Sequence, residues 1–476
     1  MAKVAASGPI SFSSIQAIMG GSGPVSMSQY AQLSNSYFAR GVPTVPNTNV
    51  NVGSFAGQPK VLSSGFMYRT FPGVAYAETP SSFDTATESA SGLITNFANL
   101  TTATNSVFTA NGGNGICSAD WFGYFYAPNT GSYTFTLGSD DGSYLWMGST
   151  ALTGYTIGNC LINNGGSHGV QYVSGSISLT AGTYTALRIV FNNGGSGYDC
   201  QFSFSGPSIS STSNFAGYAF FGLGTNSSYP ANHARHIKAI TNGNVDGQYY
   251  MNIKGSTVPI YCLMNSTWNG GGWMMMMKAS ATGDTFTYNS TYWTDVNTIL
   301  NSGDITRTAA DAKYSSMNNT LVKDILAVWP DTGYTGGSIA SPPDSWTWQM
   351  DNFYSSGTRT TIMNGLSEAN TRDTPSYSNP TTFPGFSSSI WSKQDGASRH
   401  VFGAGTHLGS CAWAKVRWGF WWNNEGDFSS NDVIGGIGIY FAHPSLTSSY
   451  SAGDAIGCCQ SSAGLNRRMR VELYGR

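Results

Sequence analysis

Residues Trp121–Gly148 have the sequence WFGYFYAPNTGSYTFTLGSDDGSYLWMG. Apolar and polar side chains alternate over Tyr133–Leu137, and Ser143–Met147 is a mostly apolar run. Turn-forming residues separate these runs at Pro128–Gly131 and Ser139–Gly142. Alternation with a period of two is typical of strands that have one buried face. The stretch therefore predicts consecutive antiparallel strands joined by tight turns.

The same pattern continues toward the C-terminus of this region. Ile177–Leu179 and Tyr184–Val190 are further apolar or alternating runs, and Asn163–Gly166 is another turn cluster. Many short strands separated by Gly- and Asn-rich turns favour an antiparallel β-sandwich. We expect this sandwich to span residues 61–210. Residues 211–234, a stretch with many Ser, Asn and Gly residues, are expected to form a linker.

Residues 1–60 contain a degenerate short repeat. Its copies are Ile10–Ile15, Val25–Tyr30 and, more loosely, Val50–Phe55, with connectors rich in Gly, Pro and Asn. Short alternating segments of this kind predict extended pieces that cannot bury a core by themselves. We expect an extended N-terminal arm, which either docks onto an assembly partner or is an ordinary ordered arm of the domain that follows.

Composition limits the class of protein. The chain has 476 residues, which at roughly 100–200 residues per domain favours two to four domains. Hydrophobic residues make up 40%, aromatic residues 13% and charged residues only 10%, which excludes a charged coiled coil and a disordered tail. The net charge of -2 argues against nucleic acid as a partner. No apolar run approaches the ~18 residues of a membrane span, so we expect no membrane insertion.

Residues 235–476 differ in character from the first half. They carry most of the charged side chains, and strand-like runs alternate there with long loops rich in Ser, Asn and Gly. The segment Thr320–Val328 is expected to form a short helix. This half is therefore expected to be an α+β domain with long loops, and the whole chain a β-rich multidomain protein.

The Trp121–Gly148 stretch resembles the PA14/GLEYA β-sandwich module of adhesins and toxins. The resemblance rests on a Pro-x-x-Gly-x-Tyr-x-Phe hairpin followed by Ser-Asp-Asp-Gly-Ser-x-Leu-Trp. Arg188–Gly195 and Ser205–Pro207 are similar to the later strand and loop of that module. The resemblance implies that residues 61–210 fold as one such module.

In carbohydrate-binding members of that family, paired aspartates and an asparagine on the later loop hold calcium, which in turn holds sugar hydroxyls. The resemblance implies a metal and ligand site at Asp140 and Asp141, with Asn192 or Asn193 as partner. Calcium takes about 6–8 oxygen ligands, and adjacent carboxylates on a Gly-flanked turn can present them with little crowding. The alternative is that Ser139–Gly142 is an ordinary hairpin turn whose side chains cap backbone amides.

Segments of the second half resemble a fibrinogen-like domain and, within that family, the intelectin branch. The segments that carry this resemblance are Val245–Ile253, Val258–Met264, Gly270–Ala279, Arg417–Glu425 and Arg470–Arg476. In intelectins an Asn-Asn-Glu stretch belongs to a calcium-dependent glycan site. The resemblance therefore implies a fibrinogen-like domain over residues 235–476, with metal and ligand contacts at Asn424 and Glu425.

The residues around this stretch favour a cation site on their own chemistry. Asn424, Glu425, Asp427 and Asp432 place carboxylate and amide oxygens within one short segment, and a hard cation such as calcium prefers oxygen ligands. Trp422, two residues before Asn424, is a candidate platform on which a ligand could stack. The His- and Glu-rich stretch that follows in intelectins is absent, so a purely structural ion is an open alternative.

The sequence contains neither an HExxH nor a P-loop motif, and its histidines are scattered, so we do not expect an enzyme. The N-terminal repeats resemble the arms of structural and fibre proteins of tailed phages and large aquatic viruses.

The leading hypothesis is a virion structural protein of the fibre, tail or capsid surface, whose adhesin-like modules bind host-cell glycans with the assistance of calcium. Its arm would contact other virion proteins, and homo-oligomers or multicopy display would strengthen weak glycan contacts. The alternatives are a non-lectin decoration or assembly protein and a cellular surface adhesin.

Overall fold

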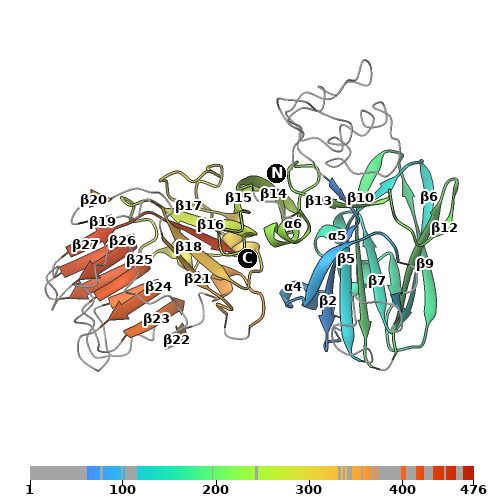
Figure 1. Cartoon of the computed structure of the whole chain (residues 1–476), viewed down its shortest axis with the longest axis horizontal. Helices are drawn as coiled ribbons and strands as arrows, with labels where there is room; N and C mark the ends of the chain where they lie inside the picture. Colours follow the sequence, from blue (N-terminus) through green and yellow to red (C-terminus); the bar gives the residue numbers. More distant parts are fainter. Residues whose placement is uncertain are drawn as a thin grey trace, which may run out of the picture. The chain divides into compact units, whose positions relative to one another are not determined.

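The computed structural model describes residues 62–75, 79–97, 100–101, 115–195, 197–241, 245–330, 334–335, 338–339, 346–354, 357–365, 369–372, 398–403, 414–422, 433–443, 446–456 and 465–476 (Figure 1). These residues fall into two compact units. The first runs to residue 259 and includes 264–272, and the second contains 260–263 and the residues from 273 onward. The arm expected over residues 1–60 lies outside the described residues.

The first unit contains an antiparallel β-sandwich. Among the described residues one sheet has eight strands, in the order β1-β13-β5-β10-β7-β8 with β2 beside β5 and β3 beside β2, and the other has five, in the order β12-β11-β6-β9 with β4 beside β11. The first sheet consists of β1 (Leu62–Ser64), β2 (Phe66–Pro72), β3 (Ala90–Ile94), β5 (Cys117–Ala127), β7 (Ser143–Met147), β8 (Ile162–Asn164), β10 (Thr183–Asn193) and β13 (Ala219–Gly222). The second consists of β4 (Leu100–Thr101), β6 (Gly131–Asp140), β9 (Gln171–Leu179), β11 (Asp199–Gly206) and β12 (Ile209–Thr212). The predicted β-rich, multidomain fold class is confirmed.

Aromatic side chains between the two sheets form the core of the sandwich. Along β6, Tyr133, Phe135 and Leu137 are fully buried, while the residues between them face outward, as the alternation in the sequence predicts. Phe125 of β5 packs edge-on against Phe135 at a centroid distance of 5.0 Å and against Phe204 at 4.9 Å. Burying each such side chain contributes about 1.5–3 kcal/mol. This aromatic layer therefore holds the two sheets together.

A second apolar layer covers the outer face of the eight-stranded sheet, and α4 (Ser82–Thr85), α5 (Ser149–Leu152) and η3 (Ile157–Asn159) contribute to it. The segment expected to be a linker, residues 211–234, also belongs to the sandwich. Phe220 of β13 is buried in this layer, and Tyr229 packs edge-on against Tyr124 at 5.5 Å. Burial of an aromatic side chain is favourable in free energy relative to exposure. The aromatic residues of this segment therefore pack onto the sandwich, where a solvent-exposed linker was expected. α6 (Ala234–Thr241) and β14 (Gly247–Ile253) follow within the same unit.

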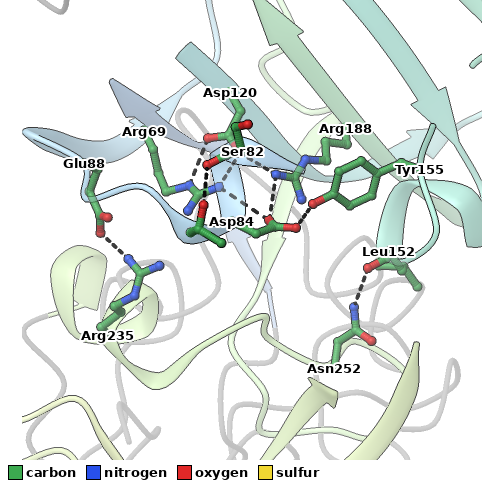
Figure 2. Close-up of polar contacts among 11 residues, drawn as sticks. Arg69, Ser82, Asp84, Glu88, Asp120, Leu152, Tyr155, Arg188, Arg235 and Asn252 are labelled. Carbon is green, nitrogen blue, oxygen red and sulfur yellow. Dashed lines mark hydrogen bonds and ion pairs between the residues drawn. The ribbon is translucent and has the colours of Figure 1, made fainter. Parts of the chain in front are cut away.

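A network of charged side chains, buried except for Asp84, attaches α4 to this outer face (Figure 2). Arg69 Nε donates to Asp120 Oδ1 at 2.9 Å, and Arg188 Nη2 donates to Asp120 Oδ2 at 2.9 Å. Asp84 of α4 accepts from Arg188 Nη2 at 3.1 Å and from the hydroxyl of Tyr155. Asp120 is fully buried and neither arginine is more than 4% exposed. Two guanidinium groups and two carboxylates thus compensate one another where an unpaired charge would be costly.

The second unit contains two larger sheets, one in the order β15-β16-β28-β18-β21 with β17 beside β16, and one in the order β22-β23-β24-β25-β26-β27. Only residues 260–263 of β15 belong to this unit. The strands of the first are β15 (Ser256–Leu263), β16 (Trp273–Ala279), β17 (Ala312–Lys313), β18 (Ile325–Trp329), β21 (Trp346–Met350) and β28 (Val471–Gly475). Those of the second are β22 (Ala369–Arg372), β23 (Ser398–Gly403), β24 (Ala414–Trp422), β25 (Val433–His443), β26 (Leu446–Ile456) and β27 (Leu465–Arg468). The remaining elements are β19 (Tyr334–Thr335), β20 (Ser338–Ile339), η4 (Thr291–Trp293), α7 (Ser315–Asn319) and α8 (Ile362–Gly365).

The helix expected over Thr320–Val328 is wrong, because Ile325–Trp329 form strand β18. β18 lies between β28 and β21, and every one of its residues is buried. A strand covered on both faces is apolar throughout and lacks the alternation that distinguishes a strand from a helix. The fibrinogen-like assignment of this half stays a prediction. In the part of the chain that the structure describes, none of the helices is long and apolar enough to cross a membrane.

Candidate functional site

The aspartate turn and the asparagine loop predicted from the sequence meet at one end of the sandwich. Asp140 is the last residue of β6, in the five-stranded sheet, and Asp141 follows it through a cis peptide bond. Asn192 and Asn193 are the last residues of β10, in the eight-stranded sheet. The backbone N–H of Asn192 donates to the carbonyl of Gly142 at 2.9 Å. The two segments, distant in sequence, are therefore in direct contact.

The carboxylate of Asp141 connects two loops beside this contact. Its Oδ1 accepts from the Ser167 hydroxyl at 2.9 Å and from the His168 backbone N–H at 2.9 Å, and its Oδ2 accepts from the Gly194 N–H at 2.8 Å. The side chain is only 8% exposed. Asp141 thus fixes the β8–β9 loop and the β10–β11 loop relative to the aspartate turn. These three donors could not be identified from the sequence, where only the Gly- and Ser-containing segment around Ser167 marks a loop.

Asp140 faces a second carboxylate that the sequence analysis did not identify. Asp199 of β11 lies directly opposite Asp140 in the register of the two strands. Asp199 Oδ2 accepts from Gln201 Nε2 at 3.3 Å, whereas its Oδ1 is buried without a hydrogen-bond partner among the described residues. Desolvation and the charges of Asp141 and Asp199 raise the pKa of Asp140, although His168 lowers it. The site therefore holds an excess of negative charge.

The two asparagines differ in their surroundings. Asn193 is fully buried, and its Nδ2 donates to the carbonyl of Gly115 at 3.0 Å. Its Oδ1 is buried and has no hydrogen-bond partner in the described part of the chain. Asn192 is 7% exposed. A Cβ atom added at Gly142 would lie 3.5 Å from the Asn192 Oδ1. Asn192 is therefore the amide that lies beside the aspartate turn.

The chemistry of these donors suits calcium. Asp140, Asp141 and Asn192 offer carboxylate and amide oxygens, the ligands that calcium prefers, and a cation would offset the repulsion between Asp140 and Asp199. Within the described ranges, no group of three or more His, Cys, Asp and Glu side chains is arranged to hold a metal ion. A calcium ion here would therefore need amide, backbone, water or ligand oxygens to complete its coordination.

The second predicted site cannot be placed in the same way. Asn424, Glu425, Asp427 and Asp432 lie outside the described residues. Trp422 is the last residue of β24, and its side chain is also outside the described part. The calcium and glycan contacts predicted for these residues stay predictions.

Residues 117–206 match the family model of the GLEYA domain, which confirms the predicted PA14/GLEYA-like module in this part of the chain. No curated protein matches the chain at a significant level.

Three similar solved structures each align with about a third of the chain. An anti-sigma factor domain-containing protein from Clostridium clariflavum has 18% identity and a TM-score of 0.27, over 33% of this chain and 47% of that one. The chain therefore spans about half the length of that protein. The PA14 domain of the antifreeze protein MpAFP has 18% identity and a TM-score of 0.28, over 34% of this chain and 94% of that one. The epithelial adhesin 9 A domain from Candida glabrata, in complex with Galb1-4GlcNAc, has 15% identity and a TM-score of 0.28, over 34% and 91%.

Proposed function

We propose that the sandwich binds glycans through a calcium ion held at the Asp140–Asp141 turn. The observation that supports this most directly is the contact between that turn and the end of β10, which brings Asn192 beside two adjacent carboxylates. Calcium takes about 6–8 oxygen ligands, so these side chains leave positions that adjacent sugar hydroxyls can fill. The hydrogen bonds to Asp141 hold the surrounding loops in place before a ligand arrives, which lowers the entropic cost of binding.

Calcium and glycan binding by the full-length protein test this proposal together. We expect calorimetry to detect calcium binding, and a glycan array to give signals that disappear in EDTA and in Asp140→Asn. Asp351→Asn changes an exposed carboxylate of the second unit and serves as the matched control. Glycan binding that persists in EDTA would contradict the role of calcium, and a folded wild-type protein that binds no glycan would contradict the lectin proposal altogether.

The contacts of Asp141 also favour a second candidate, a decoration or assembly module that binds no sugar. The carboxylate already accepts three hydrogen bonds from the protein and is almost completely buried. In that case Asp141 acts only as a loop anchor, and Asp141→Asn lowers stability without changing any calcium-dependent property. The calcium titration therefore separates the two functions.

For the whole chain we propose a virion structural protein rather than an enzyme, displayed in many copies on the outer surface and attached to other virion proteins by residues 1–60. Low charge, β-rich display modules and the repeats of residues 1–60 support this role. Deleting the arm should abolish incorporation into particles and leave glycan binding per molecule unchanged. Incorporation of the armless chain would contradict the anchoring role.

A second calcium site with Trp422, Asn424, Glu425, Asp427 and Asp432 completes the proposal for the C-terminal half. Glu425→Ala should remove one equivalent of bound calcium while leaving the sandwich site intact. An unchanged calcium stoichiometry in this variant would exclude the second site.

A further inference from the structure

An exposed aromatic ring lies on the same sheet face as Asp140. Tyr172, at the start of β9, is 58% exposed, the largest exposed fraction among the large apolar side chains of the described residues. It pairs with Gly138 of β6. A Cβ added at Gly138 would lie 2.3 Å from Tyr172 Cε1 and 2.6 Å from Cδ1. The ring therefore rests directly on the backbone of Gly138, where any larger residue would displace it, and the rest of the ring is open to solvent.

The position of this ring relative to the aspartate turn follows from the strand geometry. Gly138 and Asp140 are two residues apart on β6, so they face the same side of the sheet at a spacing of about 7 Å. That spacing is about the width of one sugar ring. The loop that leads into β9 is itself attached to Asp141 through Ser167 and His168. The ring and the carboxylates are thus held in one rigid arrangement at one end of the five-stranded sheet.

We propose that Tyr172 determines which sugars the site accepts, by stacking on the C–H face of a pyranose ring whose hydroxyls are held at the aspartate turn; this rests on the proposed glycan-binding function. Tyrosine offers a rigid, amphipathic contact surface at a low cost in side-chain entropy. A pyranose with an uninterrupted patch of C–H groups can cover the exposed ring face. A sugar that presents a hydroxyl on that face must desolvate it without a hydrogen-bond partner and is disfavoured. The ligand class is therefore a pyranose that combines adjacent hydroxyls on one edge with one apolar face.

Two variants address the ring without touching the proposed calcium ligands. Tyr172→Ala removes the ring, and Gly138→Ala keeps the ring but fills the place on which it rests. Both should weaken binding of the glycans that the wild type selects by about tenfold and should leave calcium affinity, measured by terbium luminescence and calorimetry, within twofold. Tyr172→Phe should retain binding, because stacking uses the ring and not the hydroxyl.

Ser174→Ala is the matched control. Ser174 lies two residues further along β9 on the same face, where its hydroxyl lies 2.8 Å from that of Thr136. Wild-type affinity in Tyr172→Ala and Gly138→Ala, with glycan binding otherwise present, would overturn the role of Tyr172 and leave the proposed function intact. Loss of calcium affinity in Tyr172→Ala would assign the ring a structural role instead. A wild-type protein without any glycan binding would refute the proposed function and this inference with it.

Discussion

Replacing Asp199 with asparagine should change the stability of the calcium-free protein and its calcium affinity in opposite directions. Asp199 lies directly across from Asp140, and its Oδ1 is buried without a partner among the described residues. Carboxylates placed opposite each other on a sheet repel at a cost of about 0.2–1 kcal/mol. Asp199→Asn removes this repulsion and keeps the shape of the side chain. The free energy of unfolding in EDTA at neutral pH should therefore rise by about that amount.

Calcium affinity should fall in the same variant, because Asp199 attracts a bound cation even when it is not a ligand. With calcium at Asp140, the Asp199 carboxylate would be about 6 Å away, given the usual spacing of opposed Cβ atoms. Coulomb's law for a divalent cation and one carboxylate then gives about 1.4 kcal/mol at the dielectric constant of water. That energy corresponds to about a tenfold loss of affinity.

The pH dependence of the free energy of unfolding gives a third test of Asp199→Asn. Desolvation and the charges of Asp141 and Asp199 raise the pKa of Asp140 in the folded protein. A carboxyl whose folded pKa exceeds its unfolded value binds its proton more tightly when folded, so stability falls as pH rises through the interval between the two values. Asp199→Asn removes one cause of the shift, and this fall should become smaller.

Chemical denaturation in EDTA from acidic to neutral pH measures the stability, and calorimetry measures the calcium affinity. Asp351→Asn again controls for loss of one surface carboxylate. An Asp199→Asn protein that is less stable than the wild type in EDTA, or that binds calcium as tightly as the wild type does, would refute this account of the site.

Two other side chains allow independent tests. Asp120→Ala leaves two buried arginines without their shared partner and should destabilise the first unit by about 3–5 kcal/mol in denaturant unfolding; a change below about 1 kcal/mol would contradict the role of the network. Burial lowers the pKa of Lys313 from 10.5 to about 8. The folded pKa is below the unfolded value, so the free energy of unfolding of the wild type should rise as pH increases across this interval. Lys313→Met should lack this rise when denaturation is measured at a series of pH values.

The sandwich was predictable because its signals are local. Alternation along Tyr133–Leu137, the apolar run Ser143–Met147 and the turn residues between them each lie within a few positions of one another. The same local reasoning was wrong for Ile325–Trp329, since a strand buried on both faces has no alternation to detect. It also missed that residues 219–222 complete the eight-stranded sheet.

The candidate site was predictable only in part. The resemblance carried by Ser-Asp-Asp-Gly named Asp140 and Asp141, yet neither Asp199 nor Tyr172 stood out from the many similar residues of the chain.

Local sequence was thus sufficient for the strands and the turns, because backbone preferences and hydrophobic periodicity act over short distances, and the resemblance of one short segment to a known module named the aspartate pair. Which side chains face that pair was decided by the folded chain alone. Asp199 lies opposite Asp140, and Tyr172 lies over Gly138, through the register of β6 with β11 and β9. Register depends on packing between residues far apart in the sequence, and no short segment contains that information.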